Sequence, residues 1–513
     1  MVKIFFDFLR RYGYALLSGL LIFLSFPTID LYLLAWVGIV PFLFSIYGKE
    51  SKEAFKAGFL FGLVYFFGTT FWIYHSIHKY GGFPFSSSIV LVFLLCAYLS
   101  LYPSVFAFLY ARTIRKTDLP SIIVAPALWT SLEYLRSYAF TGFPWSSIGY
   151  SQYKFLPFIQ VSDITGIYGI SFLVIAFNAG IVDLLLLKRR RTEKPLYSRL
   201  PTIFGFTSIA CFLIFSFSYG FYRLYEPRDG KEIKTAIIQG NIEQDRKWDS
   251  SYQQFVISAY KELTLQASEH KPDLIIWPET SLPFFFGKDK PLTEDLVFFQ
   301  QQLDAYLLFG SVLEKKSMQE NGYTNSAVLL NKSGSVSYIY DKIHLVPFGE
   351  YVPLRTILFF IDKLVYGIGD YVPGNHYLKA ITPFGSFGTA ICYEIIFPGL
   401  VRKFFTRGGD FMVTMTNDAW FGNTAGPYQH FSMSVFRAIE NRKPVLRAAN
   451  SGISGFIDSN GRIIDKTGLF EKTFSVFSFK TDQKLSFYTK YGDIFSYFCI
   501  VFSLLFISKR LIK

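Results

Sequence analysis

Hydrophobic positions follow two different patterns along the chain. Long apolar runs fill most of the first 224 residues and return near the C-terminus, whereas short apolar runs separated by turn residues fill the stretch between them. A helix needs roughly 17–25 mostly apolar residues to cross a bilayer. On that measure we predict eight membrane spans, some of them short: 12–29, 31–47, 55–75, 87–111, 120–138, 166–187, 202–221 and 493–508.

The stretch between the seventh and eighth predicted spans has the pattern of a mixed α/β domain. Short β-branched or aromatic runs bounded by turn residues predict strands, and they alternate with helical patterns, which favours a layered domain. The predicted strands are 235–239, 273–277, 306–311, 326–330, 336–340, 389–392, 411–416, 445–448, 455–458 and 473–479, and the predicted helices are 250–269, 293–303 and 428–442. We therefore expect a transmembrane bundle at 1–224, the α/β domain at 225–485, and a C-terminal transmembrane helix with its tail at 486–513.

Composition and charge agree with a membrane protein. Only 17% of the residues are charged, against about 25% in ordinary soluble domains. The net charge of +13 does not indicate nucleic-acid binding, because Lys and Arg gather in alternate loops beside the apolar runs. Such basic loops stay in the cytoplasm. Both termini are therefore expected in the cytoplasm, and the α/β domain on the outer side.

Cys392 is the candidate nucleophile, because it is the one cysteine of four outside a long apolar segment. Glu279 and Lys342, like Cys392, stand at the ends of predicted strands. A partly desolvated carboxylate can act there as a base, and an ammonium can stabilise a thiolate and an oxyanion. The cysteines lack CxxC spacing and the six histidines lack zinc-type spacing, so we expect no metal and no cofactor.

The order Glu279, Lys342, Cys392 resembles the nitrilase superfamily, and the neighbouring motifs more closely resemble the apolipoprotein N-acyltransferase family of bacterial inner membranes. The matching segments in the α/β domain are 239–241 with Trp248, 277–280, 340–342, 345–351 with Pro353, 391–394, 416–422, 429–430, 437–440 and 447–450 with Gly452. Segments 129–136, 142–145 and 149–150 match in the membrane part, so the resemblance covers essentially the whole chain.

This resemblance implies an α-β-β-α sandwich attached to about eight transmembrane helices in the bacterial inner membrane, with the sandwich in the periplasm. It implies an enzyme that moves a fatty acyl chain from a phospholipid to the N-terminal amino group of S-diacylglyceryl-cysteine in an apolipoprotein, the last step of lipoprotein maturation. Cys392 would carry the chain as a thioester in a ping-pong reaction, with Glu279 as base and Lys342 as oxyanion partner.

Further side chains are candidates for supporting roles. The resemblance favours Glu350 as the residue that orients Lys342, while a structural salt bridge accounts for it equally well, and Glu394 is a second such carboxylate. A backbone amide near Tyr393 is expected to join Lys342 in holding the oxyanion. Three aromatic residues either wall a lipid pocket or belong to the core: Trp248, Tyr393 and Trp420.

Other interpretations remain open. A membrane-anchored carbon–nitrogen hydrolase would use the same triad and release the acyl group to water, although one anchor would serve it as well as eight spans. A transporter would need ionisable residues deep in several spans, and Glu133 and Asp183 are the obvious candidates. The apolar but charged segment 353–373 is either an arm that dips into the membrane surface or a helix packed on the domain.

Overall fold

The structure is a computed structural model that describes residues 2–117, 119–190, 200–227, 230–316, 321–352 and 371–508. Its internal contacts divide the chain into two units. The helical unit comprises Met1–Tyr74, Pro84–Tyr225 and Tyr491–Lys513, and the α/β unit comprises His75–Phe83 and Glu226–Lys490. Most of the predicted arm or packed helix, residues 353–370, lies outside the described residues.

The helical unit is built from helices of very different length. They are α1 (Val2–Leu24), η1 (Tyr32–Leu34), α2 (Ala35–Gly38), α3 (Val40–Ile46), α4 (Ser51–Thr70), α5 (Ile73–His75), α6 (Phe85–Lys116), α7 (Ser121–Arg136), η3 (Ile148–Gln152), α8 (Leu156–Ile159), α9 (Ser162–Thr165), α10 (Ile167–Arg190), α11 (Leu200–Tyr225) and α17 (Ile494–Ser508). Among the described residues, three helices are long and apolar enough to cross a membrane, or four if the bent pair Ser51–Thr70 and Ile73–Tyr80 counts as one span.

This number is lower than the eight predicted spans because several predicted segments form interrupted or short helices. The segment 31–47 breaks into η1, α2 and α3. Helix α7 has 16 residues and α17 has 15, which falls below the roughly 17 that a span requires. The chain is therefore a membrane protein with three to four apolar helices of full membrane length in the described part of the helical unit.

Buried acidic side chains in the helical unit act as acceptors for backbone amides. Asp183 accepts from the amides of Ser121 and Ile122 at 3.0 and 2.9 Å, at the start of α7. Glu133 accepts from the amide of Ile148 at 2.9 Å. Backbone amides inside a bilayer must find partners within the protein. Both carboxylates therefore have a structural role, which argues against the transporter interpretation.

The α/β unit is a sandwich of two six-stranded sheets. Its strands are β1 (Glu232–Gln239), β2 (Leu274–Ile276), β3 (Tyr306–Lys316), β4 (Asn321–Leu330), β5 (Val336–Asp341), β6 (Lys379–Thr382), β7 (Gly385–Ile391), β8 (Phe411–Thr416), β9 (Val445–Ala449), β10 (Gly455–Ile457), β11 (Ile463–Lys466) and β12 (Thr473–Lys480). The first sheet has the order β12-β1-β2-β3-β4-β5 and the second β11-β10-β9-β8-β7-β6. In each sheet three neighbouring strands run parallel, β1-β2-β3 and β7-β8-β9.

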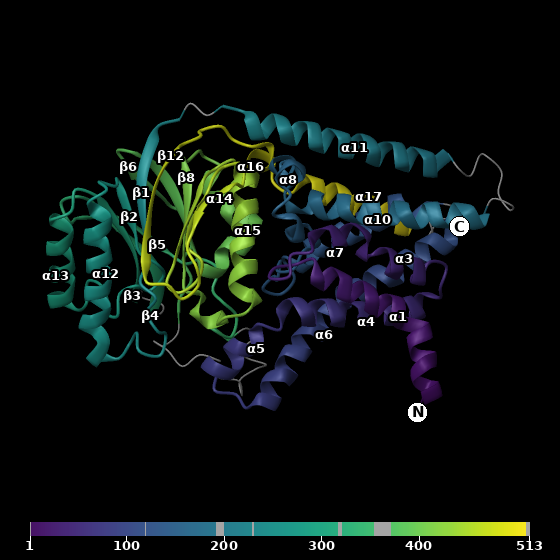
Figure 1. Ribbon diagram of the computed structural model, residues 1–513, viewed down its shortest axis with the longest axis horizontal. Helices are drawn as coiled ribbons and strands as arrows, with labels where there is room; N and C mark the ends of the chain where they lie inside the picture. Colours follow the sequence, from purple (N-terminus) through teal and green to yellow (C-terminus); the bar gives the residue numbers. More distant parts are fainter. Residues whose placement is uncertain are drawn as a thin grey trace. The chain divides into compact units, whose positions relative to one another are not determined.

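Helices cover the outer face of each sheet, which gives four layers (Figure 1). Helices α12 (Gln253–Ser268) and α13 (Lys290–Gln301) lie on the first sheet, and α14 (Pro398–Phe405) and α15 (Ala425–Asn441) on the second. Aromatic rings join the two sheets: the ring centres of Phe456 and Phe477 are 4.6 Å apart, and those of Phe411 and Phe479 are 5.4 Å apart. Short turns complete the unit: η2 (Ser76–Tyr80), η5 (Ser250–Tyr252), η6 (Cys392–Ile396), η7 (Asp418–Phe421) and α16 (Phe487–Tyr491). The predicted α-β-β-α sandwich is confirmed.

Each predicted strand and helix of this domain is present, with ends shifted by a few residues. The structure adds β6, β11 and α14, which the sequence pattern did not reveal. Strand β11 is exposed along its whole length, so it has no apolar alternation to detect. One shift concerns the site directly, because β7 ends at Ile391 and Cys392 begins the turn η6 instead of ending the strand.

Candidate active site

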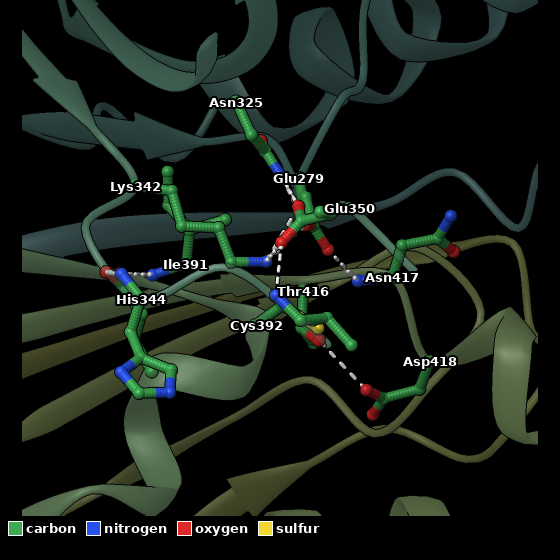
Figure 2. A network of polar contacts seen from close by, with 12 residues as sticks. Glu279, Asn325, Lys342, His344, Glu350, Ile391, Cys392, Thr416, Asn417 and Asp418 are labelled. Atoms are coloured by element: carbon green, nitrogen blue, oxygen red, sulfur yellow. Dashed lines mark hydrogen bonds and ion pairs between the residues drawn. The ribbon is translucent and has the colours of Figure 1, made fainter. Parts of the chain in front are cut away.

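The three residues predicted to act together lie at the same edge of the sandwich. Glu279 is the third residue after β2, Lys342 directly follows β5, and Cys392 directly follows β7. Strand β5 is antiparallel to β4, which is antiparallel to β3, so β5 ends at the same edge as the parallel strands. Figure 2 shows the Lys342 side chain extended toward the carboxylates. Sheets of this kind bind ligands at the carboxyl ends of their strands.

Lys342 is a buried ammonium held by two carboxylates. Its side chain is 1% exposed, and its Nζ lies 2.9 Å from Glu350 Oε2 and 3.7 Å from Glu279 Oε1. Burial by itself lowers the pKa of Lys342, but Glu350, Glu279 and Cys392 outweigh burial and raise that pKa well above its ordinary value. Lys342 therefore keeps its charge, and Glu350 is the closer of its two partners.

Amide groups hold the carboxylate of Glu279 in place. Asn325 Nδ2 donates to Glu279 Oε1 at 2.7 Å and to Glu350 Oε1 at 2.9 Å, so it bridges the two carboxylates. The backbone amide of Asn417 donates to Glu279 Oε2 at 2.9 Å (Figure 2). Sequence reasoning missed Asn325, because it lies inside β4 and stands in no motif.

A second buried lysine stands behind Glu279, and sequence reasoning missed it as well. Lys247 is fully buried, and its Nζ donates to the backbone carbonyl of Glu279 at 3.2 Å. Burial lowers the pKa of Lys247 to about 8, although Glu279 acts in the opposite direction. The chain also passes close by on the β3 side, because a Cβ on Gly310 would lie 2.7 Å from Glu279 Cα. The available signal for Lys247 was its neighbour Trp248, which belongs to a matched motif.

Cys392 rests as a protonated thiol in a strained turn. Its φ angle is 52°, in the left-handed region that residues with a Cβ rarely adopt. Burial raises the pKa of the thiol, Glu279 adds to this, and Lys342 acts against it. The net direction is upward, so the thiolate forms only when a base removes the proton.

Glu394 connects the Cys392 turn to the loop that follows β5. Its Oε2 accepts from the amide of Ile391 at 2.7 Å. Its Oε1 accepts from Tyr340 Oη at 2.8 Å and from the amides of Ile343 and His344 at 2.8 and 3.1 Å. Burial raises the pKa of Glu394 to about 7, against these hydrogen bonds. Glu350 and Glu394 therefore have different tasks: the first contacts the Lys342 ammonium, and the second joins two loops.

The aromatic candidates for lipid binding lie around this edge in half-buried positions. Trp248 packs on Phe285, with ring centres 5.7 Å apart. Trp420 packs on Tyr80 at 4.7 Å. Tyr393 is half-buried directly after Cys392. The contribution of these three residues to lipid binding stays a prediction.

Two family models match the chain, one for each unit. The model for the apolipoprotein N-acyltransferase N-terminal domain matches residues 18–180. The model for carbon-nitrogen hydrolases matches residues 234–482. The second match contains every residue of the site described above.

Curated relatives match over almost the full chain. An apolipoprotein N-acyltransferase from Geobacter metallireducens is 40% identical over 495 residues, which cover 96% of this chain and 93% of the relative. One from Pasteurella multocida is 35% identical over 477 residues, covering 90% and 88%. Among solved structures, Saccharomyces cerevisiae Nit3, a member of branch 10 of the nitrilase superfamily, aligns with 50% of this chain and 92% of its own at 17% identity and a TM-score of 0.38.

Proposed function

Because this chain belongs to the apolipoprotein N-acyltransferase family and N-acylates lipoproteins through its nitrilase-superfamily domain, we propose that Cys392, Glu279 and Lys342 are its catalytic residues. One observation carries the proposal: the buried Lys342 ammonium lies 3.7 Å from Glu279 Oε1, at the edge of the sandwich where Cys392 follows β7. Nucleophile, base and oxyanion partner are the groups that acyl transfer through a thioester requires.

The first half-reaction loads the enzyme with the acyl chain of a phospholipid. Glu279 takes the proton from Cys392 Sγ, and the thiolate attacks the ester carbonyl. Lys342 Nζ and the amide of Tyr393 stabilise the tetrahedral oxyanion. The carbon–oxygen ester bond then breaks, the leaving oxygen takes the proton from Glu279, and lysophospholipid departs. The acyl chain remains as a thioester on Cys392.

The second half-reaction passes the chain to an amine. The N-terminal amino group of a diacylated apolipoprotein attacks the thioester carbonyl, and the same two donors hold the oxyanion. Glu279 takes a proton from the attacking nitrogen and returns it to Cys392 Sγ as the carbon–sulfur bond breaks. The product amide is released and the resting thiol is restored, so donor and acceptor use the site in turn.

We further propose that the helical unit crosses the bacterial inner membrane eight times, with both termini in the cytoplasm and the α/β unit in the periplasm. Two observations support this. Each of the eight apolar segments coincides with a helical element or group of elements: α1, η1-α2-α3, α4, α6, α7, α10, α11 and α17. The basic residues also gather in alternate loops. The same topology divides the chain into a transmembrane bundle (1–224), the α/β domain (225–485) and a C-terminal transmembrane helix with its tail (486–513).

The proposed function is tested with the purified full-length chain in detergent, a phospholipid and a diacylated lipopeptide. We expect wild-type protein to form a thioester on Cys392 in the absence of acceptor, visible as a hydroxylamine-sensitive acyl adduct in the mass of the intact protein. Addition of the lipopeptide should discharge the adduct and produce N-acylated peptide. Cys392→Ala should do neither.

A matched control is Cys211→Ala, which removes an exposed thiol of the helical unit and should leave both steps intact. A wild-type-like adduct on the Cys392→Ala variant would refute the assignment of the nucleophile. Release of free fatty acid without N-acylated peptide would favour water as the acceptor, and with it the hydrolase interpretation.

A further inference from the structure

A buried polar cluster lies behind the Cys392 turn, and the reaction above makes no use of it. Its four members are buried: Thr416 at the end of β8, Asp418 in η7, His430 on α15 and Arg447 on β9. Charged groups are costly to bury unless they are paired. The presence of this cluster directly behind a nucleophile therefore points to a role in the reaction.

Hydrogen bonds connect the cluster to the backbone of the nucleophile. His430 Nε2 lies 3.1 Å from the carbonyl oxygen of Cys392. On the other side of the ring, Nδ1 lies 3.0 Å from Asp418 Oδ1 and 3.0 Å from Arg447 Nη2. Arg447 Nη2 donates to Asp418 Oδ2 at 2.8 Å. Thr416 Oγ1 donates to Asp418 Oδ1 at 2.9 Å, the contact drawn behind Cys392 in Figure 2.

These contacts determine which ring nitrogen of His430 carries a hydrogen. A carbonyl oxygen only accepts, so Nε2 must carry the hydrogen that it shares with Cys392. Burial lowers the pKa of His430, and Arg447 lowers it further, while Asp418 acts against them. Nδ1 faces both a donor, Arg447 Nη2, and an acceptor, Asp418 Oδ1. Nε2 donates to the Cys392 carbonyl whether the ring is neutral or protonated, so His430 is a donor aimed at the peptide carbonyl of Cys392.

We propose that His430 is a positioning residue that acts on the oxyanion through the peptide group between Cys392 and Tyr393. The Cys392 carbonyl and the Tyr393 amide belong to one planar unit. A hydrogen bond donated to its oxygen draws electron density from its nitrogen and strengthens the N–H as a donor, since hydrogen bonds in a chain polarise one another. That N–H is the backbone oxyanion partner assigned above, so the inference rests on the proposed function.

The local backbone explains why this peptide group needs such support. Cys392 has a left-handed backbone, a conformation that persists in a residue with a Cβ only when the surroundings impose it. The cluster is also closely packed against the chain. A Cβ on Gly452 would lie 2.4 Å from Asp418 Oδ2, so Asp418 has no room to withdraw from His430. The bond from His430 thus sets both the rotation of the peptide group and the direction of the Tyr393 amide.

Two substitutions separate this role from a purely structural one, because each keeps the hydrogen bond of only one of the two ring nitrogens. In His430→Gln, the amide nitrogen replaces Nε2 and still donates to the Cys392 carbonyl. In His430→Asn, the shorter amide replaces Nδ1 and still accepts from Arg447, but the bond to Cys392 is lost. If His430 acts through the peptide group, the Gln variant is functional and the Asn variant is impaired. If it serves only to pair Arg447 and Asp418, the order is reversed.

The experiment uses the full chain in detergent and an equimolar mixture of dipalmitoyl phosphatidylethanolamine and phosphatidylglycerol, with carbon-13 at both ester carbonyls. Single-turnover formation of the Cys392 thioester gives the acylation rate, and isotope-edited infrared spectroscopy gives the stretching frequency of the thioester carbonyl. We expect His430→Asn to acylate about 10- to 100-fold more slowly, as expected for loss of donor alignment. Its carbonyl stretch should move toward that of a free thioester, while His430→Gln keeps a rate within about tenfold of wild type and a wild-type frequency.

Each other outcome counts against the inference. A wild-type frequency in His430→Asn, or the reversed order of the two variants, refutes it, and so does failure of both variants to fold, which would make His430 structural. A different result would refute the proposed function. If wild-type protein forms no labelled thioester on Cys392, the catalytic assignment is wrong, whereas a wild-type thioester with no effect of His430→Asn overturns the inference alone.

Discussion

The two sheets contribute to the site by different physical means. On the first-sheet side, charged groups contact one another directly, with Lys342 between Glu279 and Glu350. On the second-sheet side, a neutral thiol stands on a strained turn, and the charges of Asp418 and Arg447 stay one layer behind it. One side therefore supplies electrostatics and the other supplies geometry. Substitutions that change charge should matter most on the first side, and substitutions that change hydrogen-bond direction on the second.

The largest effect is expected from removing the ammonium of the first side. Lys342→Met keeps the length of the side chain but leaves two carboxylates facing each other and the oxyanion without its cation. We therefore expect acylation of Cys392 to slow by at least about 10³-fold. Single-turnover acylation with labelled phospholipid measures this. A rate within tenfold of wild type would show that the charge is not needed.

Glu394 tests the connection between the two sides. In Glu394→Gln, the amide NH2 must face either the Ile391 amide or the three donors that meet at Oε1, and donors that face each other repel. We expect the rate of Cys392 acylation to fall by about 10²-fold, because the turn at Cys392 and the loop at Lys342 lose their alignment.

The matched control is Glu262→Gln, the same substitution at an exposed carboxylate paired with Lys472. An exposed ion pair contributes little, so this variant should keep wild-type activity. Equal losses in the two variants would contradict the alignment role of Glu394.

Asn325 tests how the first side keeps two carboxylates close together. Asn325→Asp places a third carboxylate beside Glu279 and Glu350 and removes the shared donor. The like charges repel one another and disturb the placement of Glu279, so we expect the acylation rate to fall by about 30-fold. Asn325→Leu removes the donor without adding charge and should lower the acylation rate by about tenfold. Equal losses in the two variants would exclude the charge explanation.

The smallest effect concerns stability. Lys247 has a pKa of about 8 in the folded chain, below the ordinary lysine value of about 10.4 that applies to the unfolded chain. The free-energy cost of burying the Lys247 ammonium is therefore present in full below pH 8, and it disappears as the pH rises toward 10.4. Lys247→Met removes the charge and loses the bond to Glu279, so we expect a net gain of about 1–2 kcal/mol at pH 7.

The thermal unfolding midpoint in detergent should accordingly rise in Lys247→Met at pH 7. The gain should shrink as the pH rises above 8 and become a small loss near pH 10, where only the missing bond to Glu279 remains. A variant that is less stable than wild type at pH 7 would show that the bond to Glu279 outweighs the cost of burying the charge.

The residues that the sequence predicted best are those whose position depends on local pattern alone. Glu279, Lys342 and Cys392 each stand at a strand end, where period-two patterns and turn residues mark the boundary. Asn325 and Lys247 were not predicted, because their roles depend on which loops face each other across the sandwich. Asn325 lies within β4 and is indistinguishable by sequence from a polar residue on any strand.

The membrane part shows the same limit in another form. Hydropathy predicted eight spans, but it does not report where a helix breaks. The segment 31–47 is interrupted at Ile39, whose amide, like that of Val40, bonds to the side chain of Asn178 at 2.9 and 3.1 Å. A polar residue more than 130 positions away along the chain thus stabilises the break, and no local pattern indicates it.

The first and last strands of the α/β unit pair with each other along their whole length. Glu232 of β1 lies opposite Lys480 of β12, and Gln239 lies opposite Thr473. β1 is also the parallel neighbour of β2, the strand that leads to Glu279. During biosynthesis β1 is made first and β12 last, so the first sheet lacks this edge strand until nearly the entire domain has been translated. The sheet whose strand β2 leads to Glu279 is therefore completed only when the last strand of the domain pairs with the first.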